Sequence, residues 1–427
     1  MGMSATAMAT AADQLPASLD FVHTEVGMIP ADWSVSSLGK LGSFMKGKGV
    51  KRGDVAEDGV PCIRYGEIYT RYNDYVIEPA SRIPEKVATL SQQLQTGDLL
   101  FAASGETAEE IGKCVAYLGR GEAYAGGDIV ILRPSSSEHN PLYLGHLLNH
   151  PTVSQQKARY GQGDAVVHIS ARNLALVNVP LPPSIDEQND IADALFDVDR
   201  LIESLDALIS KKRAIKQATM QQLLTGKTRL PGFTDPWTEN RVDTLGHMFK
   251  GRGIKRDEVL DDGVPCIRYG ELYTRYRNYV SSPISHIAPD TAASSRPIQT
   301  GDLLFAGSGE TAEEIGTCVA YIGESVAYAG GDIIVLRPQG CDPVFLGHLM
   351  NHPLVAVQKA RHGQGDAVVH INGRHLAQVT LELPTRDEQE AIARVALDMD
   401  REITALCQRR DKTQAIKQGM MQQLLTG

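Results

Sequence analysis

The sequence predicts a mixed α/β fold of two tandem globular domains separated by two long helices, which pair as an antiparallel coiled coil. Three observations lead to this prediction: the length, an internal repeat, and a heptad pattern that closes each repeat. A chain of 427 residues is too long for one ordinary core and suits two or three domains. With 42% hydrophobic and 22% charged residues, the chain can bury sizeable cores.

The repeat is visible as nearly identical segments. PCIRYGEIYTRY at 61–72 returns as PCIRYGELYTRY at 265–276, and GQGDAVVHI at 161–169 returns at 363–371. The offset falls from 204 to 202 residues between these segments, which small loop deletions explain. A period this long indicates a duplicated domain and not a solenoid unit.

Each copy opens with short apolar runs cut by glycine and proline, which predict strands. In the first copy these runs are 62–65, 98–102, 114–118 and 128–132. The domain boundaries that follow are a flexible N-terminal segment at 1–20, a first domain at 21–183, a central helix at 184–226, a second domain at 227–384 and a C-terminal helix at 385–427.

The two helices carry their own start signals and a shared seam. Ser184 with Glu187 fits the capping box that opens a helix, and Thr385 with Glu388 repeats it. Apolar residues then step by three and four, as in a coiled coil. The predicted seam is Ile191, Leu195, Val198, Ile202, Leu205 and Ile209 in the first helix, and Ile392, Met399, Ile403 and Leu406 in the second.

The charge pattern predicts how the helices pair. Both are acidic in their first half and basic in their second half, so parallel pairing would set like charges against each other. Antiparallel pairing sets acid against base, and we therefore expect an intramolecular antiparallel coiled coil. The alternative is that each helix is amphipathic and covers its own domain.

Several function classes are not supported by the motifs. LLTGKT at 223–228 lacks the first glycine of a phosphate-binding P-loop, and neither copy holds a G-x-S-x-G elbow or a dinucleotide fingerprint. The six cysteines include no C-x-x-C pair, which predicts no metal site and a reducing cytoplasm. We expect no catalytic residues and no cofactor. The alternative is a hydrolytic enzyme that uses the turns at Asp164/His168 and Asp366/His370 as acid/base pairs.

Basic, aromatic and amide side chains beside glycines recur in both copies and suit nucleic-acid binding. Arg can bond guanine edges, Glu can accept from cytosine, Gln can read adenine and Lys can anchor phosphates. The net charge of −10 argues against nucleic-acid binding only if the charge is spread evenly. Eight of the acids lie on the first helix between Asp186 and Asp206, so the sign of the charge in the domains can differ from that of the whole chain. The candidate contacts are Lys46, Lys48, Arg64, Tyr65, Glu67, Tyr69, Arg71, Ser104, Glu106, Gln162, Asp164 and His168 in the first copy, and Lys250, Arg252, Arg268, Tyr269, Glu271, Tyr273, Arg275, Ser308, Glu310, Gln364, Asp366 and His370 in the second.

The order of motifs resembles the DNA specificity subunits of type I restriction-modification systems. TEVGMIPADWSVSSLG, GDLLFAASGE, VPLPPSIDEQ and QQLLTGKTRLPGF appear in that order, and GDLLFAGSGE, LELPTRDEQ and MMQQLLTG follow in the second half. The resemblance implies two target-recognition domains that each read half of an interrupted double-stranded DNA site. It also implies spacer helices that dock two methyltransferase subunits, with endonuclease subunits where present, and a subunit without catalytic activity of its own.

The similarity of the two copies predicts a near-palindromic target, because matched domains related by an antiparallel helix pair would read similar, inverted half-sites. Three pairs of residues that differ are candidates for changing one base: Asn73/Arg277, Lys113/Thr317 and Tyr160/His362. The remaining alternative is a coiled-coil adaptor with no role in DNA binding.

Overall fold

The computed structural model describes residues 20–107, 110–163, 166–309, 311, 314–363 and 369–426. The expected flexible segment at 1–20 therefore lies, except for Asp20, outside the described residues. The chain forms two compact units. Unit 1 runs to Asp206 and resumes at Arg409, and unit 2 spans Ala207–Gln408, so each unit holds one globular domain and parts of both long helices.

Unit 1 is built on a five-stranded sheet whose order is β4-β13-β9-β11-β6. All its pairings are antiparallel except that of β11 with β6, and every residue of β9 and β11 is buried. The strands are β4 (Gly42–Lys46), β13 (Ile129–Pro134), β9 (Leu99–Ala102), β11 (Cys114–Tyr117) and β6 (Tyr75–Val76). Four buried apolar residues in a row suit a strand that is covered on both faces.

Smaller elements surround this sheet in unit 1. A second sheet has the order β7-β5-β12-β8, with β7 (Ser81–Ile83), β5 (Val60–Ile63), β12 (Tyr124–Ala125) and β8 (Gln92–Gln93). Three strand pairs join β1 (Phe21–Thr24) to β2 (Gly27–Pro30), β3 (Ser34–Ser37) to β15 (Asn178–Leu181), and β10 (Ser104–Gly105) to β14 (Val167–His168). The short helices are α1 (Leu38–Leu41), η1 (Arg52–Asp54), α2 (Tyr65–Thr70), α3 (Glu85–Ala88), α4 (Pro141–Leu148), α5 (Pro151–Arg159) and α6 (Ala171–Leu174).

Unit 2 repeats this architecture, as the sequence repeat predicts. Its first sheet has the order β17-β27-β23-β25-β20 and its second β18-β21-β19-β26-β22, in which β18 is an additional edge strand. The strands are β16 (Thr238–Arg241), β17 (Gly246–Lys250), β18 (Val259–Leu260), β19 (Val264–Ile267), β20 (Tyr279–Val280), β21 (Ser285–Ile287), β22 (Arg296–Ile298), β23 (Leu303–Ala306), β24 (Ser308–Gly309), β25 (Cys318–Tyr321), β26 (Ala327–Ala329), β27 (Ile333–Pro338), β28 (Val369–His370) and β29 (Thr380–Leu383). The short helices are η2 (Val242–Thr244), η3 (Arg256–Glu258), α8 (Glu271–Thr274), α9 (Pro289–Ser294), α10 (Pro343–Met350), α11 (Pro353–Ala360) and α12 (Gly373–Leu376).

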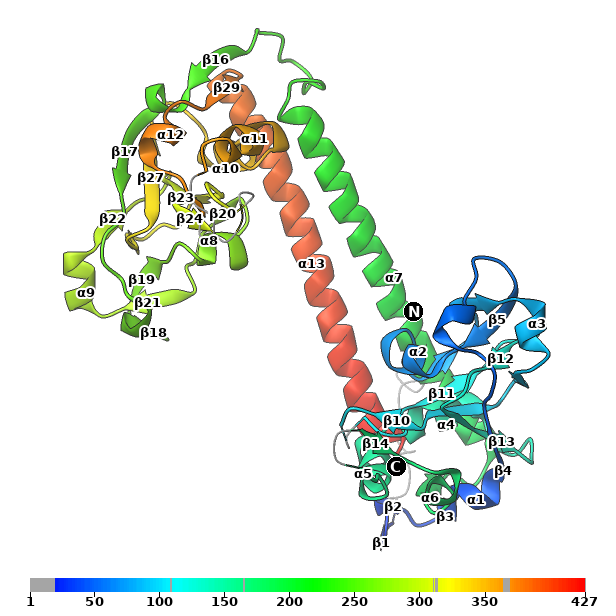
Figure 1. Cartoon of the computed structure of the whole chain (residues 1–427). Helices are drawn as coiled ribbons and strands as arrows, with labels where there is room; N and C mark the ends of the chain where they lie inside the picture. The colour runs from blue at the N-terminus through cyan, green and yellow to red at the C-terminus, as the bar shows by residue number, and fades with distance from the viewer. Residues whose placement is uncertain are drawn as a thin grey trace, which may run out of the picture. The chain divides into compact units, whose positions relative to one another are not determined.

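The two long helices are α7 (Ile185–Leu223) and α13 (Arg386–Leu424), each of 39 residues (Figure 1). The N–H of Glu187 donates to Ser184 Oγ at 3.1 Å, which is half of the expected capping box. Gly226, with a φ of 65°, follows the end of α7 in the left-handed conformation that commonly stops a helix.

Ion pairs show that α7 and α13 run antiparallel in both units. In unit 1, Lys417 Nζ lies 2.7 Å from Asp199 Oδ1, and Arg410 Nη1 lies 3.3 Å from Asp206 Oδ1. In unit 2, the same pairing joins α7 residues Lys212 and Lys216 to Glu402 and Asp400 of α13, at 2.6 and 2.5 Å. The residue numbers of the paired side chains rise along α7 as they fall along α13, and each pair joins an acidic to a basic residue. The predicted antiparallel arrangement is confirmed.

Some of the predicted seam residues pack into the domains. Ile191 and Leu195 belong to the core of unit 1, and Ile392 to the core of unit 2, so the first turns of both helices cover their own domains. Leu205 and Ile209 are buried further along α7. The other predicted seam residues, Val198, Ile202, Met399, Ile403 and Leu406, are half-buried.

The far end of each helix also fills a core. Leu425 is fully buried in the core of unit 1, and Met420, Met421 and Leu424 pack against it. Met220, Leu223 and Leu224 of α7 are part of the core of unit 2. Each globular domain is therefore completed by the end of the helix that follows the other copy. No helix in the described part of the chain has a stretch long and apolar enough to cross a membrane, and all six cysteines are free.

Candidate nucleic-acid interface

The RYGEIYTRY segment of the first copy forms the short helix α2, and its glutamate turns inward. Glu67 is 4% exposed, and its carboxylate accepts from the Arg64 N–H and from Arg64 Nη2, both at 2.9 Å, and from Ser81 Oγ. The carboxylate thus satisfies donors at the start of the helix. This leaves part of the Arg64 side chain, 34% exposed, at the surface.

The second copy has the same arrangement. Glu271, also 4% exposed, accepts from the Arg268 N–H and from Arg268 Nε at 3.0 Å, and from Ser285 Oγ at 2.5 Å. The expectation that Glu67 and Glu271 accept from cytosine does not fit this placement, because both carboxylates are buried and already bonded. Both act as internal anchors for the arginines beside them.

A hydrogen-bonded chain joins α2 to two loops from elsewhere in the first copy. Tyr69 OH donates to the carbonyl of Ser104 at 2.8 Å, and Ser104 pairs with His168 across the two-residue strands β10 and β14. Ser104 Oγ lies 2.9 Å from His168 Nδ1. We call Ser104 and His168 the first hairpin site, a label for two antiparallel strands that pair although they are far apart in the sequence. Segments that are up to 100 residues apart in the sequence therefore meet at one place.

Lysine 46 lies at the same end of the main sheet. Strand β4 ends at Lys46, which pairs with Val130 of β13, and Asp128 just before β13 accepts from the N–H of Ala103 through its carbonyl at 3.0 Å. Ala103 in turn adjoins Ser104. Lys46, Tyr65 and His168 are all exposed. The first hairpin site is therefore bordered by a lysine and by an exposed aromatic ring on the helix that Tyr69 anchors.

The second copy has the corresponding pair Ser308 and His370, which we call the second hairpin site, with Ser308 Oγ 2.9 Å from His370 Nδ1. A cavity of about 680 Å³ opens beside it. Its polar lining is Lys250, Ser308, Asp332, His370, Asn372 and Arg374, and its apolar lining includes Met248, Ile334 and Ile371. Lys250 Nζ lies 3.4 Å from Asp332 Oδ1. The cavity brings together three of the predicted contacts, Lys250, Ser308 and His370.

Other predicted contacts have simpler placements. Lys48, Arg71, Glu106, Gln162, Arg252 and Arg275 are exposed, and the rings of Tyr269 and Tyr273 lie 6.4 Å apart at a tilt of 52°. Asp164, Glu310, Gln364 and Asp366 lie outside the described residues. The proposed Asp164/His168 acid/base pair therefore has only its histidine in the described structure, where Nδ1 is engaged by Ser104.

Two buried lysines support the hairpin sites from within. Lys157 is 1% exposed, and its Nζ donates to the carbonyls of Gly112 at 2.7 Å and Leu148 at 2.6 Å. Burial lowers the pKa of Lys157 to about 8, and that of Lys359, whose Nζ donates to the Gly316 carbonyl, also to about 8. Gly112 and Gly316 end the loops that follow the two serines. The lysines therefore hold Gly112 and Gly316 in place and are not surface contacts.

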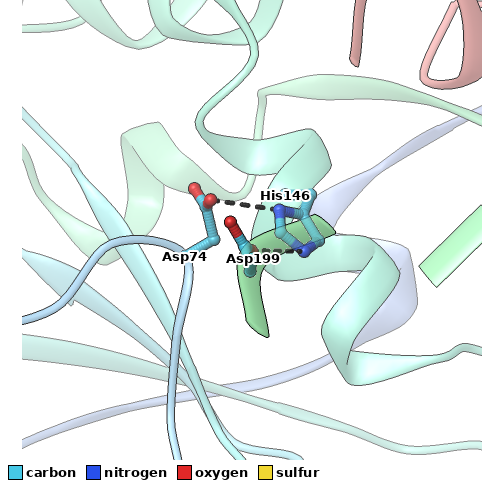
Figure 2. Close-up of side chains that lie close together, drawn as sticks. All are labelled: Asp74, His146 and Asp199. Atoms are coloured by element: carbon cyan, nitrogen blue, oxygen red, sulfur yellow. Dashed lines mark hydrogen bonds and ion pairs between the residues drawn. The ribbon is translucent and has the colours of Figure 1, made fainter. Parts of the chain in front are cut away.

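A second polar cluster lies where α7 and α13 meet the first domain (Figure 2). Asp74 Oδ2 is 3.0 Å from His146 Nδ1, and His146 Nε2 is 3.8 Å from Asp199 Oδ2. Within the described part of the chain, these three residues are the one group whose ligand atoms could share a metal ion. However, Lys417 Nζ lies 2.9 Å from Asp74 Oδ2 and 2.7 Å from Asp199 Oδ1. The cation between the two carboxylates is therefore an ammonium group.

The electrostatics of this cluster agree with an ion network. Burial alone would raise the pKa of Asp74, but the hydrogen bond and charge of His146, and then the charge of Lys417, bring it below its ordinary value. Burial likewise opposes the charge of Lys417, yet Asp74 and Asp199 raise its pKa. The network fixes the end of α13 to unit 1. The matching positions of unit 2 are Asn278, His348, Asp400 and Lys216, so one carboxylate is replaced by an amide.

A duplicated mixed α/β domain, with two antiparallel helices whose ends complete the opposite copy's domain, defines a class of two-domain proteins with an internal repeat. Residues 30–211 match the sequence model of the type I restriction modification DNA specificity domain. Over 96% of both chains, the sequence is 24% identical to a putative type I restriction enzyme specificity subunit, MjaX, of Methanocaldococcus jannaschii. The MjaVIII specificity subunit of the same organism is 26% identical over 49% of each chain.

Solved structures show the same fold. The S subunit of a type I restriction-modification system from M. genitalium matches 97% of this chain and 98% of its own, with a TM-score of 0.61 and 13% identity. A chain from a structural study of complex assembly in the type I system matches 93% of this chain and 99% of its own, with a TM-score of 0.57 and 14% identity.

Residues 30–211 thus match the type I restriction modification DNA specificity domain, and the whole chain is similar in sequence and in fold to type I specificity subunits, as its motifs predicted. The similar proteins are named as specificity subunits, which agrees with the expectation that this chain is a non-catalytic subunit. Neither the hydrolase nor the coiled-coil adaptor is supported by these matches.

Proposed function

We propose that each unit reads one half of a bipartite double-stranded DNA site through its hairpin site. The observation that carries this proposal is that α2, the Ser104–His168 pair and the Lys46 end of strand β4 lie close together. Phosphates need lysine and arginine, and base edges need directed donors and acceptors, and both kinds of side chain occur here. The same set recurs in the second copy around Ser308 and His370.

The proposed contacts divide by chemistry. Lys46 and Lys250 lie at the sheet ends and suit phosphates, which position the duplex without reading its sequence. In Arg64 and Arg268 a buried glutamate accepts from both the backbone N–H and the guanidinium, which fixes the direction in which the guanidinium can approach a base edge. Glu67 and Glu271 are left out of the proposed contacts because they are buried.

The target that this arrangement supports is interrupted and nearly palindromic. The two copies share their Ser–His pairs, their anchored arginines and their sheet topology, so similar half-sites are expected. The domains proposed to read them are those at 21–183 and 227–384, with the helices at 184–226 and 385–427 as spacers. The antiparallel pairing of α7 and α13 would invert one half-site relative to the other.

The proposal also covers partners. The similar proteins are named as subunits of type I restriction-modification systems. We propose that this chain brings two methyltransferase subunits, and endonuclease subunits where present, to its DNA site. A cytoplasmic location suits both the free cysteines and the DNA target. None of these partners requires the chain to span a membrane.

The test is selection from random duplexes by the full chain with its methyltransferase partner, followed by mapping of the methylated sites. We expect two similar, inverted half-sites and a strong fall of affinity with salt. Arg64→Ala should relax the sequence preference of one half-site, whereas Lys46→Ala should weaken all sequences alike. Enrichment of no sequence, or of one contiguous site, would refute the proposal.

A further inference from the structure

The two hairpin sites share their polar pair but differ in the residues around it. In unit 2, the residues that line the cavity next to His370 are Asn372 and Gly373, where unit 1 has Ser170 and Ala171. The preceding Lys250 and Ser308 are unchanged from Lys46 and Ser104. Other lining residues differ too, since Met248, Gly307 and Ile334 stand where the first copy has Phe44, Ala103 and Val130.

Gly373 leaves space that its counterpart would fill. A Cβ atom at Gly373 would lie 3.8 Å from Ile334 Cγ2 and 3.8 Å from Met248 Cε, both of which belong to lining residues. These are ordinary van der Waals distances, so an alanine would fit without strain and would take up room against an apolar wall. Gly373 thus leaves an apolar recess against Ile334 and Met248 that an alanine side chain would fill.

Asn372 presents a donor toward the same cavity. Its Oδ1 caps α12 by accepting from the N–H groups of Arg374 at 3.0 Å and His375 at 3.1 Å. This leaves the Nδ2 amide as a donor for a ligand. Ser170 caps α6 in the same way, with its Oγ accepting from the Asn173 N–H at 3.2 Å, and it retains only its shorter hydroxyl donor.

An amide donor beside a small apolar recess matches one base edge in particular. Thymine presents the O4 acceptor next to its C5-methyl group in the major groove, whereas cytosine presents a donor and no methyl group. Two of the residue pairs that the sequence analysis named as candidates for changing one base, Lys113/Thr317 and Tyr160/His362, fit the reading of a thymine edge less well. Lys113 Nζ is bonded to the Tyr72 carbonyl at 2.7 Å, and the ring of His362 stacks on His375 at 5.3 Å.

We propose that the cavity at the second hairpin site receives a thymine edge of the target, with Asn372 donating to O4 and the recess at Gly373 holding the methyl group. The first copy has Ser170 and Ala171 at these positions, and we expect it to read that base pair with less discrimination. Asn372 and Gly373 are then specificity-determining residues that make one half-site differ from the other. This inference rests on the proposed reading of DNA by the hairpin sites.

The experiment is binding-site selection with the full chain and its methyltransferase partner, using the double variant Asn372→Ser/Gly373→Ala. Both residues already occur at these positions in the first copy, so the fold should be retained, and a thermal melt checks this. We expect the preference for thymine at one position of one half-site to fall about tenfold, with the other half-site unchanged. The reciprocal variant Ser170→Asn/Ala171→Gly should sharpen the other half-site toward thymine.

A second measurement isolates the methyl group. Replacing that thymine by deoxyuridine in the selected duplex should weaken binding by the unmodified chain several-fold and leave binding by the Gly373→Ala variant unaffected. Unchanged selection profiles for both double variants, with sequence-specific binding intact, would overturn the inference while leaving the proposed function standing. Loss of all sequence preference in the unmodified chain would instead overturn the proposed function and the inference with it.

Discussion

Replacing Lys417 by methionine should destabilise unit 1 far more than its place near the end of the sequence suggests. Its side chain is 13% exposed and lies against Asp74 and Asp199, whose side chains are each 10% exposed. Lys417→Met would leave two buried carboxylates with no ammonium partner, and only His146 and Asn149 would still bond Asp74. Removing one partner from a buried ion network costs about 3–5 kcal/mol, because the remaining charges stay desolvated.

The matched control is Lys212→Met on the same helix pair. Lys212 is 33% and its partner Glu402 49% exposed, so the loss there should be no more than about 1 kcal/mol. The difference between the two variants therefore depends on burial, since each removes one lysine from an ion pair between α7 and α13.

The chain offers one tryptophan in each unit as a probe. Trp33 is buried in unit 1 and Trp237 packs against the core of unit 2. Urea unfolding followed by Trp33 fluorescence, in a Trp237→Phe background, reports on unit 1. We expect Lys417→Met to lower the free energy of unfolding of unit 1 by at least about 2 kcal/mol more than Lys212→Met lowers that of unit 2, which Trp237 fluorescence reports in a Trp33→Phe background.

The same variant should change the pH dependence. The pKa of Asp74 is lowered in the folded chain, so its contribution to stability is present above its unfolded pKa of about 3.9 and is lost as pH falls. Without Lys417, burial favours protonation of Asp74, and the gap between variant and unmodified chain should narrow below about pH 4. Equal destabilisation by both lysine variants at pH 7, or a gap that does not narrow in acid, would refute the reasoning.

Three further outcomes are expected. Glu67→Gln should lower stability by about 1–3 kcal/mol, because it weakens bonds to Arg64 and Ser81 inside the domain; a stability unchanged in thermal melts would contradict this. Burial lowers the pKa of Lys157 to about 8, below its unfolded value of about 10.4, so the folded chain gains stability as pH rises between these values; Lys157→Met should remove up to about 3 kcal/mol of that gain, and parallel pH profiles would count against it. Lys46→Ala should reduce the salt dependence of DNA binding by about one counterion, which titrations at several salt concentrations would measure.

The fold could be predicted from the sequence because its main signals are periodic and duplicated. Three of the expected first-copy strands, at 98–102, 114–118 and 128–132, correspond to β9, β11 and β13 within two residues at each end. The strand expected at 62–65 begins and ends two residues earlier in the structure, at Val60–Ile63, because helix α2 begins at Tyr65. The segment after it alternates charged and aromatic residues, which does not distinguish a six-residue helix from a strand.

The site could be predicted only in part, because burial decides between a contact and an anchor. Glu67 follows Arg64 by three residues, which is the spacing of a carboxylate at a helix start, so the sequence does carry a signal for this internal contact. Lys157 lies four residues after the buried Val153 on α5, which placed it on the inward face. The ion network of Asp74 with Lys417 joins residues 343 apart, and no local pattern indicates such a contact.

The burial of Leu425 in unit 1 imposes an order on biosynthesis. The globular part of unit 1 emerges from the ribosome first, yet the side chains that close its core lie after Arg409. At about 5–20 residues per second, the roughly 200 intervening residues take about 10–40 s to synthesise. During that interval the nascent first domain exposes the apolar surface that Leu425 later covers. The first segment to reach it is the end of α7, where QQLLTG at 221–226 repeats the sequence at 422–427. Correct assembly therefore requires that the end of α7 pack into the core of the second domain and leave the surface of the first to the end of α13.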